Sequence, residues 1–295
     1  MEKNATTWRD GALSDTAPPM QPPSISLDRI RRILGGNPEA VALLGSVHEF
    51  YGGCLQFLEE TETDKPVGKV SFRFCHDNQA GRALQSAEVT IKMGHERAPV
   101  SIIHELLHLA LRIRGFPIGF PSEDSAHPES LVDQDELRGV ALNALDHFLF
   151  KARFVEIGFP PAEIVPDPRR NRESYINSWT DTFSRWGYES PDAVRCACHT
   201  YFIGFITDSV RDTSGEVAAC RAACEPYLPD ISSRMRWLPD WFDRRDFATP
   251  TLFPRAFHEA LTHMGVPHQP LCVLVKTDRA IEARDPLGAT ARGRS

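Results

Sequence analysis

The chain has 295 residues, of which 41% are hydrophobic, and a formal net charge of -7. This length and hydrophobic content are sufficient for a sizeable core in one large domain or two modest ones. A nucleic-acid-binding protein carries a dense positive patch, and neither the net charge nor any block of Lys and Arg in this sequence supplies one. We therefore expect no nucleic-acid partner.

The first 24 residues contain no continuous apolar stretch of the kind that a signal peptide needs, and nowhere do eighteen apolar residues occur in succession. The sequence therefore predicts no membrane partner and a cytoplasmic location. The seven cysteines are odd in number and unevenly spaced. This pattern favours reduced thiols over a disulfide framework, which agrees with a cytoplasmic location.

Both ends of the chain have the composition of disordered tails. Residues 1–24 are rich in Pro, Ser and Thr without periodicity, and residues 283–295 are small and polar. Within the folded part, the best candidate boundary is a proline-rich connector at 158–173. We therefore expect a first region at 25–158 and a helical C-terminal region at 159–282 that packs on it.

Two helices and then two strands are predicted in the first region. Segments 27–34 and 38–60 have helical periodicity, with Pro38 in a plausible first turn. Residues 69–77 alternate in polarity, and residues 87–94 are rich in residues that favour strands. The polar, glycine-containing connection between these two segments indicates an antiparallel pair.

Helices predominate after these strands. A helix is predicted at 98–114, ended by Gly115, and a second long helix at 130–157, ended by Gly158. Beyond the connector, the pattern predicts four further helices, at 172–187, 191–211, 215–227 and 253–265. It also predicts one short strand at 271–275. The fold class is therefore α+β and mostly helical, with a small antiparallel sheet beside the 98–114 helix and a helical C-terminal half.

The sequence HELLH at 104–108 lies inside the predicted 98–114 helix. Positions four apart lie on one helical face, so His104 and His108 can direct ring nitrogens at one metal ion about 2.0 to 2.1 Å away. Glu105 lies beside that face, where a carboxylate can accept a proton from a water molecule. The remaining surface of the helix is apolar, and unpaired histidines there would be costly. The pattern therefore favours a catalytic zinc site over a helix with ordinary histidines.

This motif, on a helix preceded by strands, resembles that of the zincin superfamily of zinc metallopeptidases. The resemblance covers residues 69–158 and implies a zincin-like fold with His104 and His108 as zinc ligands and Glu105 as the general base. It also implies that the strand before the zinc helix, here 87–94, borders the substrate cleft and pairs with an extended peptide.

The third zinc ligand is expected on the 130–157 helix. Metzincins continue the motif with a Gly and a third His where this sequence has Leu111 and Arg114, so the resemblance is gluzincin-like instead. Helical spacing places three polar side chains of the later helix on one stripe, in a largely apolar helix. These three residues are Glu136, Asn143 and His147.

His147 is the preferred third ligand, because it lies in the most apolar part of that helix and a neutral imidazole is a common zinc ligand. Glu136 is the second choice, because gluzincins take a glutamate. Asp146 is either a carboxylate that orients an imidazole or the ligand itself.

The sequence as a whole predicts a zinc-dependent metallohydrolase that cleaves a peptide or protein substrate, with Glu105 activating water. The first alternative is a zincin-like domain that is not a peptidase, in which a structural or sensing metal supports protein binding. The second is hydrolysis of an amide that is not a peptide. Specificity depends on the walls of the cleft, which the sequence does not position.

Overall fold

The computed structural model describes residues 22–63, 65, 67–77, 81–119, 134–164, 241, 244, 246–263 and 271–286. The helices predicted at 172–187, 191–211 and 215–227 lie outside these residues. Within the described part, helices and a curled mixed sheet share one hydrophobic core. This combination of helices and a sheet is compatible with the predicted α+β class.

Two short helices open the fold, α1 (Leu27–Leu34) and α2 (Pro38–Tyr51). Each has an N-cap side chain that satisfies a free backbone amide, Ser26 for α1 and Asn37 for α2. The predicted helix at 38–60 was wrong in its last third, because α2 ends at Tyr51 and residues Leu55–Glu59 form strand β1.

Two causes explain this early end of α2. Gly52 has a φ of 53°, a conformation outside the right-handed helix that glycine adopts at little cost. The apolar residues that follow then pair with a strand distant in the sequence, and such pairing overrides a local helical pattern.

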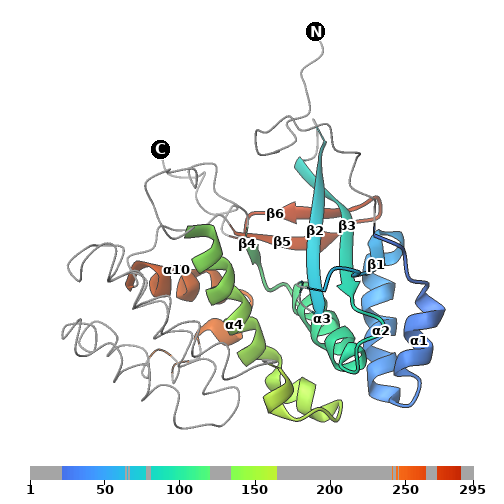
Figure 1. The fold of residues 1–295 in the computed structure, drawn as a ribbon. Coiled ribbons are helices and arrows are strands. Elements are labelled where there is room, and N and C mark those ends of the chain that lie inside the picture. The colour runs from blue at the N-terminus through green and yellow to red at the C-terminus, as the bar shows by residue number, and fades with distance from the viewer. Residues whose placement is uncertain are drawn as a thin grey trace, which may run out of the picture.

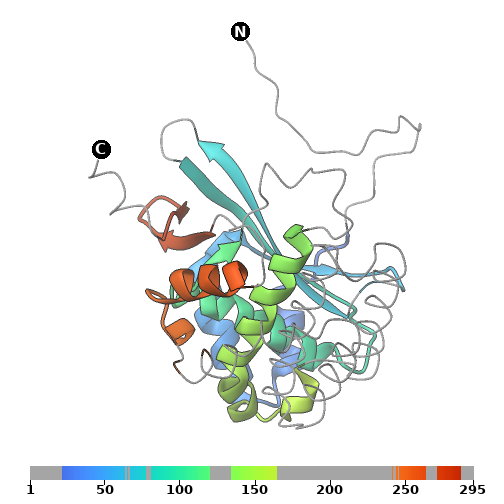
Figure 2. The ribbon, with the colours of Figure 1, turned by 90° about the vertical axis from the view of Figure 1, so that its left-hand side faces the viewer.

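The central strand of the sheet is β3 (Gly81–Ile91). It pairs antiparallel with β2 (Gly68–Asp77) and parallel with β1, so the sheet is mixed and not antiparallel throughout as expected. The predicted strand at 69–77 is confirmed, whereas the next strand begins and ends earlier than the predicted 87–94. Figure 2 shows the β2–β3 hairpin extending beyond the helices.

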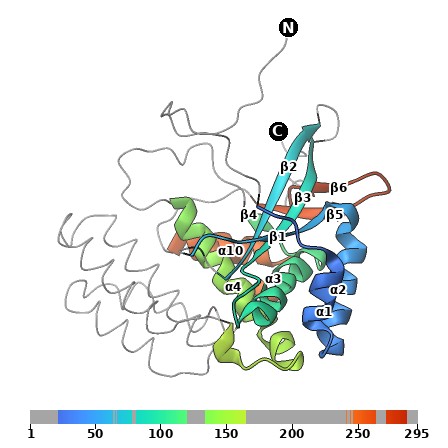
Figure 3. The same cartoon turned by 45° about the vertical axis from the view of Figure 1, so that its right-hand side comes forward.

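The end of the chain completes this sheet. Strands β5 (Leu271–Lys276) and β6 (Ile281–Arg284) pair with each other, β6 pairs with β3, and the short β4 (Ile118–Gly119) pairs with β5. The strand order is β1-β3-β6-β5-β4, with β2 attached to β3. Strands β5 and β6, from the predicted C-terminal region, thus belong to the same sheet as β3 of the first region (Figure 3). Strand β6 ends at Arg284, two residues into the predicted tail at 283–295.

The two long helices lie where the sequence predicts them, as α3 (Ala98–Ile113) and α4 (Gln134–Glu156). Gly115 and Gly158, which follow these helices, have φ values of 87° and 105°. Helix α3 lies between α2 and α4, against the sheet (Figure 1). Helix α10 (Phe253–His263) and the 3-10 turns Gly52–Cys54, Pro161–Glu163 and Asp246–Ala248 complete the described fold.

None of the described helices combines the length and the apolar composition that crossing a membrane requires.

Candidate metal centre

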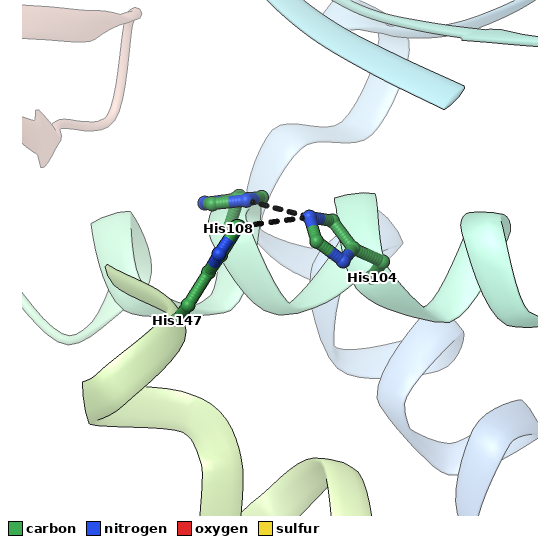
Figure 4. A group of neighbouring side chains, drawn as sticks. All are labelled: His104, His108 and His147. Carbon is green, nitrogen blue, oxygen red and sulfur yellow. Dashed lines mark hydrogen bonds between the residues drawn. The ribbon is translucent and has the colours of Figure 1, made fainter. Parts of the chain in front are cut away.

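Helices α3 and α4 bring three histidine side chains to one point. Figure 4 shows His104 and His108 on α3 and His147 on α4 with their rings turned toward one another. The Nε2 atom of His104 lies 3.1 Å from Nε2 of His108 and 3.1 Å from Nε2 of His147. Potential metal-binding nitrogens of all three residues lie within 4.8 Å of one another.

The spacing of these nitrogens suits a tetrahedral metal ion. Zinc binds imidazole nitrogen at about 2.0 to 2.1 Å, so two ligands at tetrahedral angles lie about 3.3 Å apart. The observed 3.1 Å is close to that value. Three neutral histidines that leave a fourth position for water are a known donor set for catalytic zinc. The residues present therefore fit zinc.

Hydrogen bonding alone does not account for the cluster. The Nδ1 atom of His108 lies 3.0 Å from a carboxylate oxygen of Asp146, so the ring proton belongs on Nδ1 and Nε2 carries a lone pair. A neutral His104 carries a single N–H, so its Nε2 can form a hydrogen bond with only one of its two histidine neighbours. A cation at the centre would satisfy all three lone pairs at once.

Burial keeps these imidazoles in the form that binds metal. The pKa values of His104 and His147 lie well below the ordinary 6.5, mainly because burial disfavours the charged ring, with neighbouring histidines adding to the effect. Arg97 also lowers the pKa of His104. Both rings are therefore neutral near pH 7, and a neutral imidazole is the metal-binding form.

The Asp146 carboxylate orients a ring in this structure and does not face the three-nitrogen centre. It is 1% exposed and accepts hydrogen bonds from His108 and from the guanidinium of Arg112, whose Nη1 lies 3.2 Å from Oδ1 and whose Nη2 contacts Oδ2. Arg112 also donates to the carbonyl of Pro117, at 2.7 Å. Of the two roles predicted for Asp146, the geometry corresponds to the orienting one.

The predicted polar stripe of α4 does not stay together. His147 is buried at the centre, but Asn143 is exposed, so including Asn143 in a buried stripe was wrong. The side chain of Glu136 lies outside the described part of the structure. Its position on α4 is eleven residues before His147, or about 16 Å along a continuous helix, which places its backbone far from the three nitrogens.

Glu105 lies between the face of α3 that carries His104 and His108 and the start of β2. It is 7% exposed, and burial raises its pKa, while His108 and a hydrogen bond from the Val70 amide oppose that rise. The fit is close, because a Cβ added at Gly68 would lie 3.1 Å from Oε1 of Glu105. The carboxylate is thus held beside the histidines by the backbone of β2.

The strand at this centre is β2 and not the expected segment 87–94. Residues 87–91 of β3 pair with β1 on one side and β2 on the other, so their backbone groups are not free to bind a peptide. Strand β2 pairs only with β3 among the described strands, and its Val70 amide is directed at Glu105. The edge beside the centre therefore belongs to β2.

Comparison with protein-family models, curated proteins and solved structures gives no match.

Two residues of the centre were not predicted from the sequence. The ring centroid of Phe150 lies 5.0 Å from that of His108 and 5.5 Å from those of His104 and His147, so one aromatic side chain supports the whole cluster. Arg112 holds Asp146. Helical spacing is a signal for both, because Phe150 follows His147 by three residues and Arg112 follows His108 by four.

Proposed function

We propose that this chain is a zinc-dependent metallohydrolase of zincin-like, gluzincin-related type that cleaves peptide bonds. The observation that carries the proposal is the convergence of three imidazoles beside a buried carboxylate, with Nε2 of His104 at 3.1 Å from Nε2 of His108 and at 3.1 Å from Nε2 of His147. His104, His108 and His147 would hold the ion, and Glu105 would act as the general base.

Each residue has a defined task in this proposal. Zinc held by His104, His108 and His147 would supply Lewis acidity to the site. Glu105 accepts a proton from the attacking water, and its raised pKa brings it nearer to the range in which a carboxyl also returns a proton to a leaving amine. His108 is held in one tautomer by Asp146.

The outer edge of β2, which pairs with no other strand of the described part of the chain, supports a peptide as substrate. An extended chain adds to an exposed sheet edge through main-chain hydrogen bonds, and this edge begins beside Glu105. A peptide laid along β2 would therefore bring a scissile carbonyl to the three histidines.

Metal content tests the first step. We expect about one zinc per chain after expression with added zinc, measured by elemental analysis, and its loss in His104→Ala or His108→Ala, because two ligands hold the ion too weakly. His48→Ala is the control, since His48 is an exposed histidine of α2. A wild-type protein that binds no zinc would refute the proposal.

The third ligand is tested separately. His147→Ala should lower zinc affinity far more than Asp146→Ala, which removes an orienting contact, or Glu136→Ala. A larger loss in Glu136→Ala would make the site a closer relative of the gluzincins and would contradict the choice of His147.

Burial favours the alternative of a structural or sensing metal, because His108 and His147 are only 5% and 8% exposed and structural zinc sites are closed. Glu105→Gln separates the two functions. An enzyme should keep its zinc and its fold and lose turnover of a peptide library by roughly 100-fold or more. Equal partner binding by wild type and variant, with cleavage by neither, would favour the alternative.

A further inference from the structure

We infer that Arg112 is a positioning residue of the metal centre, which fixes the tautomer of His108 and the register of the two ligand-bearing helices through Asp146. The inference rests on the proposed metal site, but it concerns contacts that exist without the metal. Arg112 touches none of the three histidines in the described contacts, so it would act only through Asp146.

The contacts form a chain from the sheet to the metal-binding face. The Arg112 guanidinium donates to Asp146 on α4 and to the carbonyl of Pro117, next to β4, while its own backbone belongs to α3. Asp146 in turn accepts the Nδ1 proton of His108. One guanidinium therefore ties α3, which carries two ligands, to α4, which carries the third.

The chemistry of this pair suits such a role better than a role in stability. Arg112 and Asp146 are 5% and 1% exposed, and a buried ion pair is often replaced by apolar residues without loss of stability. In addition, Nε of Arg112 is buried without a hydrogen-bond partner in the described structure. Apolar replacements would, however, remove the carboxylate oxygen of Asp146 that lies 3.0 Å from Nδ1 of His108 and accepts its proton.

Arginine is specifically suited to this position. Its planar fork binds both oxygens of a carboxylate and keeps further N–H donors for a second acceptor, whereas the lysine ammonium is a point charge on a flexible stem. We therefore expect Arg112→Lys to restore only part of what Arg112→Met loses.

The experiment measures zinc affinity by competition with a chromogenic chelator and, in metal-free protein labelled with 15N-histidine, the tautomer of His108 by NMR. Arg112→Met should weaken zinc binding by roughly 10- to 100-fold. It should also convert His108 from the Nδ1-protonated tautomer to a mixture. Arg153→Met is the matched control, because Arg153 has two carboxylate partners on the surface, away from the centre.

Arg112→Met leaves the buried Asp146 carboxylate without its ion-pair partner, and this variant can therefore fail to fold. The double variant Arg112→Met/Asp146→Leu removes both charges and keeps the test decisive in that case. It should fold and bind zinc no more weakly than Asp146→Leu alone, because Arg112 acts through Asp146. Wild-type zinc affinity in Arg112→Met or in the double variant, or an unchanged His108 tautomer in Arg112→Met, would overturn the inference. A wild-type chain without zinc affinity would refute the proposed function instead, and the tautomer comparison would still test the contact chain.

Discussion

Replacing Phe150 by Leu should weaken metal binding beyond its effect on folding. Phe150 is 2% exposed and its ring contacts all three histidine rings at centroid distances of 5.0 to 5.5 Å. Leucine fills less of this space and removes the edge contacts, each worth about 0.5–1.5 kcal/mol. Without the support of the Phe150 ring, one imidazole becomes mobile in the metal-free Phe150→Leu variant and must be ordered again when zinc binds. Ordering one side chain costs about 0.5–1.5 kcal/mol, which lowers zinc affinity roughly two- to twelvefold.

Phe154 provides the matched control for this change. It lies one turn further along α4, is fully buried, and packs on Phe159 and not on the histidines. Phe154→Leu should cost a similar free energy of unfolding, on the order of 1–2 kcal/mol, against roughly 3–5 kcal/mol for Phe→Ala.

The assay combines denaturant unfolding in the presence of EDTA with zinc titration against a chelator. We expect similar unfolding midpoints for the two variants and weaker zinc binding in Phe150→Leu alone. Equal zinc affinities would show that the aromatic support of the rings is irrelevant to the metal.

Three further changes follow from the structure. Burial lowers the pKa of His104 and His147, so as pH falls the unfolded chain takes up protons before the folded chain does. Metal-free protein should therefore lose thermal stability as pH falls below about 6.5, and this loss should be smaller in His147→Gln. Gly68→Ala places a Cβ 3.0 Å from Cβ of Ser101 and should destabilise the protein by about 1 kcal/mol in denaturant unfolding. Gly45→Ala, in α2 with open space at its Cβ, should raise the free energy of unfolding by about 0.5–1 kcal/mol, and a loss would contradict the helical-propensity argument.

The sequence predicted what depends on spacing within one element. One helical turn separates His104 from His108, and the apolar surroundings of His147 correctly predicted that it is buried against something polar. The boundaries of α3 and α4 were also close, because glycines with positive φ follow both helices.

What the sequence did not predict depends on contacts between distant elements. Residues 55–59 continue an apolar helical pattern and become a strand only because β3 lies beside them. Strand β6 has four residues, two of them charged, and no local pattern marks it. Helical spacing places Arg112 near His108 and Phe150 near His147, but the contacts of Arg112 with Asp146 and of Phe150 with His108 depend on how α4 crosses α3.

The pairing of Arg82 with Ala283 has a consequence for synthesis of the chain. About 200 residues separate the two partners, and at typical translation rates the ribosome needs roughly 10 to 40 seconds to make them. During that interval β3 is on the nascent chain without β6, whereas His104, His108 and His147 have all been made long before. All three histidines of the proposed metal site are thus synthesised before the sheet can close, so a metal ion bound there would help to order the growing chain before β6 is available.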